Sequence, residues 1–338
     1  MKRKRILYIG NALTHKNVTV TTIDTLSASL RDEGYDVQVV SRIKNKIGRL
    51  WDMLRAVILY KKQVDMVLID TYSTTNYWYA VWVAKLCRFY SISYIPILHG
   101  GNLPERIKKS TSSARKLFGK AYLNIAPSTY LLNAFQKQGF KNIRHIPNTI
   151  DLTQYPFIER TTIKPNLLWV RSFASIYNPL MALQVLQELQ KKYPEATLTM
   201  VGPKKDDSFD SCIAFAKAHT LPVTFTGKLS KMEWVALGKE HDVFINTTDF
   251  DNTPISVIEG MALGLPVVST NVGGIPFLID DTVDGLLTPT KEVIPFANRI
   301  ADLLETPSLV NKLSKNGREK AESFDWDQVK ILWKDVLD

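Results

Sequence analysis

The chain has 338 residues, of which 45% are hydrophobic and 22% charged, with only 16 glycines and 16 prolines. This length and composition exclude disordered and collagen-like chains and predict two folded domains, each with its own core. The two cysteines, Cys87 and Cys212, have neither metal-ligand spacing nor the pattern of a disulfide framework.

The net charge of +10 is unevenly distributed along the chain. Residues 1–155 hold 24 Lys and Arg against 9 Asp and Glu, whereas residues 156–338 hold 19 against 24. This asymmetry predicts an anionic partner for the first half: a phosphorylated acceptor, an anionic membrane surface or nucleic acid. No nucleic-acid-binding motif accompanies the charge, so nucleic acid is not expected as a partner.

Neither the start of the chain nor its most apolar stretch predicts insertion into a membrane. Residues 1–10 are basic, but their apolar run is too short for the core of a signal peptide. The most apolar stretch, residues 77–98, is interrupted by Lys85 and Arg88. We therefore expect a cytoplasmic protein.

Short β-rich apolar runs alternate with amphipathic helical patterns, such as residues 22–31 and 128–138. The expected strands are residues 6–9, 37–40, 66–69, 94–98, 122–126 and 143–146, then 167–170, 197–201, 223–226, 243–246 and 267–269. Parallel strands need crossover connections, which are helical, so the alternation predicts an α/β fold. We expect two doubly wound, Rossmann-like parallel-sheet lobes joined near residues 155–165.

Two later helices have clear start signals. Ser230, with Glu233 three residues on, predicts a capping box. Asp325 predicts the start of a final helix with Trp326 and Trp333 on one face. That helix packs either on its own lobe or on the first lobe.

The stretch from Asn246 to Ser269 predicts an anion site. A strand ends at Asn246, and Thr253 as N-cap with Pro254 as first helical residue predict a helix after it. Its free N–H groups, at Ile255, Ser256 and Val257, would point to the carboxyl edge of the sheet, where a diphosphate could bind.

Asp251 and Glu259 flank this predicted anion site. Carboxylates beside a diphosphate are suited to accept hydrogen bonds from sugar and ribose hydroxyls. In the alternative interpretation, Asp251 only stabilises the helix start and Glu259 lies on its exposed face.

These residues resemble the donor-site signature of the retaining GT-B glycosyltransferases of family 4. The signature is an acidic residue and a glutamate eight positions on, followed by Gly-Met-Ala-Leu-Gly-Leu-Pro-Val-Val-Ser-Thr-Asn-Val-Gly-Gly-Ile-Pro at 260–276. Similar family segments are Pro-Asn-Thr-Ile-Asp at 147–151, Ala-Pro-Ser-Thr-Tyr-Leu at 126–131 and the base-contacting loop Phe-Thr-Gly-Lys at 225–228. The resemblance covers nearly the whole chain.

The resemblance implies the GT-B architecture, two lobes facing a cleft with the final helix crossing back to the first. The expected domains are an acceptor-side lobe, residues 1–156 with the helix 324–338, and a donor-binding lobe, residues 157–323. The crossing of the final helix is therefore the preferred alternative for Trp326 and Trp333.

The resemblance also implies roles for individual residues. Glu259 would hold the ribose hydroxyls of a nucleotide, and Asp251 would contact hydroxyls of the donor sugar. The other expected donor contacts are Lys228, Asn252, Thr253, Pro254, Ile255 and Ser256.

Three positions depart from the family pattern. Asp251 stands where glutamate is usual, and Thr149 where glycine is usual. The family's phosphate loop is here Val-Arg-Ser-Phe-Ala-Ser-Ile-Tyr-Asn-Pro at 170–179, which lacks the usual lysine. Arg171 is the expected diphosphate partner, because a guanidinium matches phosphate oxygens. The alternative for Arg171 is an interlobe salt bridge.

In the first lobe, His99 ends a strand in a turn that contains Gly100 and Gly101. By resemblance, His99 would contact the donor sugar or the acceptor, and it could equally be structural. Gly10 and Asn11 follow the first strand and would let the backbone approach a ligand, or form an ordinary turn.

A helical pattern between Arg42 and Lys62 carries an apolar stripe of Ile43, Ile47, Leu50, Leu54 and Ile58, surrounded by basic residues including Arg49. A second basic cluster covers residues 106–120. The stripe is expected to pack in the core, and the basic residues to face an anionic membrane or a lipid diphosphate.

The sequence thus predicts a metal-independent, retaining hexosyltransferase. It would move a sugar from a UDP- or GDP-linked donor to a glycan or lipid-linked acceptor in surface polysaccharide or glycolipid assembly, with peripheral association at the inner face of the membrane. The catalytic candidates are His99, Asp251 and Arg171. Two alternatives remain: a sugar-nucleotide epimerase of the same fold, and a catalytically silent nucleotide-sugar-binding regulator.

Overall fold

A computed structural model describes residues 4–12 and 21–338. The chain divides into two compact units, residues 1–149 with 329–338 (unit 1) and residues 150–328 (unit 2). The division falls after Thr149, earlier than the expected stretch 155–165, and Tyr155 is part of a core cluster of unit 2. Met1–Arg3 of the basic start lie outside the described residues.

Unit 1 is built on a parallel sheet of strand order β2-β1-β3-β4-β5-β6. Its strands are β1 (Arg5–Ile9), β2 (Asp36–Val40), β3 (Met66–Thr71), β4 (Tyr94–Leu98), β5 (Asn124–Ala126) and β6 (Ile143–His145). Its helices are α1 (Thr22–Asp32), α2 (Lys46–Tyr60), α3 (Tyr77–Phe89), α4 (Leu103–Lys109), α5 (Thr111–Phe118) and α6 (Thr129–Lys137). The winding reverses between β1 and β3, and open α/β sheets bind ligands at such a point.

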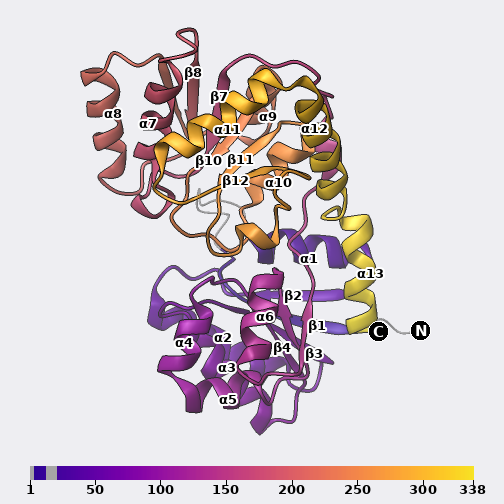
Figure 1. Cartoon of the computed structure of the whole chain (residues 1–338). Coiled ribbons are helices and arrows are strands. Elements are labelled where there is room, and N and C mark those ends of the chain that lie inside the picture. Colours follow the sequence, from indigo (N-terminus) through magenta and orange to yellow (C-terminus); the bar gives the residue numbers. More distant parts are fainter. Residues whose placement is uncertain (1–3, 13–20) are drawn as a thin grey trace. The chain divides into compact units, whose positions relative to one another are not determined.

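Helices cover both faces of this sheet (Figure 1). Leu7 and Ile9 of β1 pack in one core with residues of α2, α3, α5 and α6. The alternate residues Ile6 and Tyr8 are also fully buried. Because both faces of the sheet are covered, the strands are continuous apolar runs rather than alternating ones.

Unit 2 repeats the scheme with strand order β12-β11-β10-β7-β8-β9, again parallel. Its strands are β7 (Asn166–Val170), β8 (Thr197–Val201), β9 (Val223–Gly227), β10 (Val243–Asn246), β11 (Val267–Thr270) and β12 (Leu286–Thr288). Its helices are α7 (Pro179–Leu189), α8 (Ser208–Ala218), α9 (Lys231–Lys239), α10 (Ile255–Ala262), α11 (Val293–Glu305) and α12 (Pro307–Glu322). Leu167 and Leu168 of β7 enter different core clusters, one on each face. The winding reverses between β7 and β10.

The final helix, α13 (Trp326–Leu337), returns to unit 1. Asp325 accepts a hydrogen bond from the Asp327 N–H at 2.9 Å, as a cap would. Trp333 is 3% exposed and lies with Leu26 of α1 and Ile97 of β4 around one small cavity. Lys334 forms an ion pair of 2.5 Å with Glu33. The expected return of this helix is confirmed, and Trp326, outside that contact, is only half-buried.

The expected α/β fold with two parallel sheets is confirmed, with small differences at element ends. All the expected strands are present, and β12 had not been predicted. One strand starts later than expected, at Asn124, and Tyr122, which precedes it, is 58% exposed.

The expected burial of the apolar stripe is wrong for three of its five residues, whereas Leu50 and Leu54 are partly buried and Leu54 packs against the core. Ile47 is 71% exposed, and Ile43 and Ile58 are also exposed. The fully buried core residues of α2 are Met53, Ala56 and Val57. Arg49, counted among the basic surface residues, is buried and donates hydrogen bonds to the Ile43 and Lys44 carbonyls.

Candidate functional site

The first helical turn after β10 carries polar groups that have no hydrogen-bond partner among the described residues. α10 begins at Ile255 with Pro254 as its N-cap, so the expected start at Thr253 and Pro254 is one residue early. The Val257 N–H donates to the Pro254 carbonyl at 3.1 Å and is therefore not free, contrary to expectation. Among the described residues, the Ile255 and Ser256 amides have no acceptor, and the buried Ser256 Oγ has no partner. Such a group of donors suits an anion.

Two glycines hold the loop before α10 against the loop after β11. The Gly274 N–H donates to the Asp251 carbonyl at 2.8 Å. A Cβ on Gly274 would lie 1.8 Å from the Asn252 carbonyl oxygen, and Gly273 has a φ of +57°. Only glycine allows this approach, so the Gly-Gly of the motif, in the loop that follows β11, positions Asp251 and Asn252.

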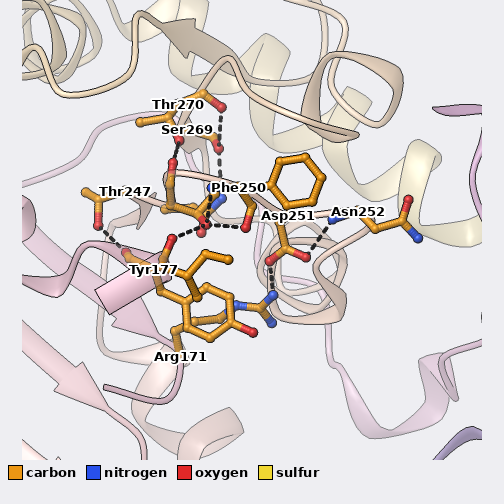
Figure 2. A network of polar contacts seen from close by, with 11 residues as sticks. Arg171, Tyr177, Thr247, Phe250, Asp251, Asn252, Ser269 and Thr270 are labelled. Atoms are coloured by element: carbon orange, nitrogen blue, oxygen red, sulfur yellow. Dashed lines mark hydrogen bonds and ion pairs between the residues drawn. The ribbon is translucent and has the colours of Figure 1, made fainter. Parts of the chain in front are cut away.

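Asp251 and Arg171 form an ion pair inside unit 2 (Figure 2). The other Asp251 carboxylate oxygen accepts a hydrogen bond from the Asn252 N–H at 2.8 Å. The Arg171 guanidinium lies 4.4 Å from the centre of the Tyr177 ring. The partner that the structure gives Arg171 is thus Asp251, a residue of the same unit.

Arg171 keeps unused hydrogen-bonding capacity in this pair. Its buried Nε has no acceptor among the described residues. Burial lowers the pKa of the Arg171 guanidinium from its ordinary value. The ordinary pKa of arginine lies far above neutral pH, so the group stays charged. An anion that reached this guanidinium would meet a charged, incompletely paired donor.

Glu259 is 5% exposed, so the alternative that it lies on an exposed helix face is wrong. Its Oε1 accepts a hydrogen bond from the Tyr155 hydroxyl at 2.6 Å and pairs with Lys231 at the start of α9. Burial, and then the charge of Glu259, raises the pKa of Tyr155, so the phenol is a donor here. Sequence reasoning missed Tyr155 and Lys231; the only local signal for Lys231 was its place after the predicted cap Ser230.

We expect Tyr155→Phe to destabilise the protein by about 1.5–3 kcal/mol, because it removes a buried hydrogen bond to a carboxylate. The measurement is the thermal unfolding midpoint of the full chain. The matched control is Tyr193→Phe. Tyr193 donates a hydrogen bond to Glu305, which also pairs with Lys192, so the three residue types are the same but lie at the exposed surface. Equal shifts in the two variants would contradict a buried, oriented Glu259.

The remaining donor-side candidates are placed near α10 or at the end of β9. Asn252, Thr253 and Ile255 are partly exposed, and Pro254 is buried. Lys228 follows β9 and is exposed.

In unit 1, the carboxyl ends of β3 and β4 bring His99 to a buried carboxylate. His99 Nε2 lies 2.7 Å from Asp70 Oδ1, and the Tyr8 hydroxyl donates to the same oxygen at 2.9 Å. Burial, and then the charge of Asp70, raises the pKa of Tyr8, which therefore stays protonated. The Tyr72 ring centre lies 5.2 Å from the His99 ring. Asp70 thus fixes the orientation of the His99 ring. Sequence reasoning missed Asp70, although an acidic residue within an apolar strand could have indicated it.

Gly10 makes room for this carboxylate. A Cβ on Gly10 would lie 2.3 Å from Asp70 Oδ2, which has no partner among the described residues. Asn11 accepts a hydrogen bond from Arg49 at 2.8 Å. Gly100 and Gly101 form the partly exposed turn that follows His99.

Among the described residues, no group of three or more His, Cys, Asp or Glu could hold a metal ion. Within the same residues, no helix is both long and apolar enough to cross a membrane.

Comparison with known proteins supports the assignment made from the motif. Residues 157–320 match the family described as Glycosyl transferases group 1. The matched segment is 164 of the 338 residues of the chain. It contains the Arg171–Asp251 pair, the open start of α10 and Glu259.

Curated relatives of this group 1 segment include two enzymes by name. The sulfoquinovosyl transferase of Arabidopsis thaliana is 30% identical over 151 residues, 43% of this chain and 28% of that protein. The glycogen synthase of Mycobacterium tuberculosis is 26% identical over 196 residues, 56% of this chain and 47% of that protein. The match thus covers less than half of either relative.

Solved structures share the fold over the whole chain. Sucrose-phosphate synthase from Thermosynechococcus elongatus aligns with a TM-score of 0.79 at 16% identity, over 99% of this chain and 98% of that one. HepE of Anabaena, solved with UDP-glucose, aligns with a TM-score of 0.77 at 17% identity, over 99% of both chains. At these identities the likeness establishes the GT-B fold.

Proposed function

We propose that the protein is a retaining glycosyltransferase of family 4 that uses a nucleoside diphosphate sugar, UDP- or GDP-linked. The observation that carries the proposal is the open start of α10, two free amides and a buried hydroxyl, flanked by an arginine and two carboxylates. One anionic ligand with hydroxyls at both ends would satisfy all of these groups. A nucleoside diphosphate sugar is such a ligand.

Each side chain would act on a different part of the donor. The Ile255 and Ser256 amides and Arg171 would bind the diphosphate and stabilise the negative charge that develops as it leaves. Glu259, held by Tyr155 and Lys231, would accept from the ribose hydroxyls. Asp251 would accept from hydroxyls of the transferred hexose, and His99 would contact that sugar or the acceptor.

In the proposed transfer, the bond from the anomeric carbon to the diphosphate oxygen breaks, and a bond to the acceptor oxygen forms on the same face. The acceptor proton moves to the leaving phosphate oxygen. The products are a nucleoside diphosphate and a glycoside with retained configuration, and no side-chain base is required.

For the acceptor we propose a glycan or a lipid-linked sugar of surface polysaccharide or glycolipid assembly. The basic first half of the chain is the support for this choice, because such acceptors are phosphorylated or lie on an anionic membrane. We propose a cytoplasmic protein, peripheral at the inner membrane face.

A ligand screen followed by product analysis tests the proposal. Thermal unfolding with UDP, GDP, ADP and their sugars should show a raised midpoint for one base, since a ligand of the folded state stabilises it. The selected donor should then be consumed with release of the nucleoside diphosphate. An epimerised sugar nucleotide as product, or binding without turnover on any acceptor, would overturn the proposal.

We expect turnover to survive chelation of divalent metal ions. Helix-end amides and Arg171 would take the place of a cation in stabilising the leaving diphosphate. The measurement is the initial rate in excess EDTA, with an added-magnesium control. A rate that is lost in EDTA and restored by magnesium or manganese would contradict metal independence.

A further inference from the structure

The outward faces of α2 and α3 expose large apolar side chains. On α2, Ile47 and Trp51 are each 71% exposed. On α3, Trp82 is 46% and Phe89 is 77% exposed. The two helices pack beside each other on one face of the unit 1 sheet, so their exposed residues form one surface, here named the α2–α3 face. Monomeric soluble proteins rarely expose several large apolar side chains together on one surface.

Basic residues are in excess in the part of the sequence that contains α2 and α3. Residues 42–120 hold 15 Lys and Arg against four Asp and Glu. The Lys85 ammonium lies 5.0 Å from the centre of the Trp82 ring. Aromatic and cationic side chains thus occupy the same surface, rather than separate patches.

A groove of about 730 Å³ continues this surface between α3 and α5. Lys85, Lys109 and Lys116 line it together with Trp78. Arg88, also in the lining, is used internally, since it donates to the Tyr94 hydroxyl and the Lys116 carbonyl. Within the described part of the chain, no carboxylate pairs with the three lysines.

We propose that the α2–α3 face docks on an anionic lipid bilayer. Trp51, Trp82 and Phe89 would enter the boundary between headgroups and acyl chains, where aromatic residues gather. The lysines would pair with lipid phosphates, and the groove would take a headgroup. This deepens the proposed role on membrane acceptors and rests on it for its purpose.

Charge favours a bilayer over a second copy of the chain as the occupant. A symmetric dimer through the α2–α3 face would place the same lysines and arginines opposite one another. Residues 42–120 hold four acidic residues against 15 basic ones, of which Arg49 and Arg88 are used internally, so such a contact would be repulsive. An anionic membrane satisfies both the aromatic and the basic residues.

Vesicle flotation of the full chain tests the proposal with matched variants. The apolar variant is Trp51→Ser with Phe89→Ser, and its control is Ile213→Ser with Ile294→Ser, two exposed apolar residues of unit 2. The charge variant is Lys85→Glu with Lys116→Glu, and its control is Lys217→Glu with Lys239→Glu, two exposed lysines of unit 2.

The wild-type chain should float with phosphatidylglycerol-containing vesicles at low salt, less at high salt, and not with pure phosphatidylcholine. The apolar variant should lose about tenfold or more in affinity, given the area of an aromatic side chain. The charge variant should lose about 30-fold or more, at about 1 kcal/mol for each basic residue near the surface. Both controls should bind like the wild type.

Three results would overturn the proposal: no flotation of the wild type, an apolar variant that binds like its control, or a wild-type dimer that Trp51→Ser dissociates. Thermal shifts with nucleoside diphosphates, measured without vesicles, report on unit 2 separately. Intact nucleotide binding without flotation would reject the α2–α3 face alone. Flotation without nucleotide binding would reject the donor site alone.

Discussion

Replacement of Glu259 by glutamine should weaken binding of the nucleoside diphosphate by about 10- to 150-fold, which corresponds to the 1.5–3 kcal/mol of a charge-assisted hydrogen bond. The shape of the side chain is kept, but the negative acceptor for the ribose hydroxyls is lost. Binding of the intact donor should weaken by the same factor, because both ligands carry the ribose. Calorimetry with each ligand measures the effect.

The matched control for this variant is Glu305→Gln. Glu305 also accepts from a tyrosine and pairs with a lysine, but on the exposed surface of α11. It should leave nucleotide affinity unchanged. If Glu259→Gln retained wild-type affinity for the nucleoside diphosphate, the ribose contact would be refuted.

Replacement of Asp251 by asparagine should lower turnover by about 100- to 1000-fold, as the loss of an interaction with the reacting group does. Affinity for the nucleoside diphosphate should not fall, because the proposed partner of Asp251 is the sugar. The variant also releases Arg171 from its ion pair, which leaves the guanidinium available to the diphosphate. Initial rates and calorimetry together separate these effects.

Two further variants sharpen the test of Asp251. Asp251→Glu restores the usual family residue and should keep more activity than Asp251→Asn. Asp249→Asn, in the same loop and hydrogen-bonded to Asn178 at 3.1 Å, is the control and should keep its turnover. Loss of nucleoside diphosphate affinity in both Asp251→Asn and Glu259→Gln would indicate a structural pair rather than two contacts.

The sequence by itself determined the features that depend on near neighbours in the chain. The alternation of apolar runs and helical patterns was sufficient for the two parallel sheets, because parallel strands require crossovers. The capping box of Ser230 and Glu233 is present, since its bonds span three residues. The donor motif at 251–276 pointed to the group 1 family because its residue types are close in sequence.

Only the tertiary structure decided which side chains meet across long sequence separations. Asp251 and Arg171 are 80 residues apart, and Glu259 and Tyr155 are 104 apart. No periodicity records such pairs. Asp251 and Arg171 meet because the neighbouring strands β10 and β7 bring their carboxyl ends together, and Glu259 meets Tyr155 because α10 packs against the segment that precedes β7.

The exposed apolar residues of α2 also could not be predicted from the sequence. The spacing of Ile43, Ile47 and Ile58 indicated an apolar helix face, but not whether anything covers it. The sheet takes up Met53, Ala56 and Val57 instead, which leaves Ile47 and Trp51 exposed. Burial is a property of what packs opposite a helix, and that is settled by the position of the other strands and helices rather than by the helix's own sequence.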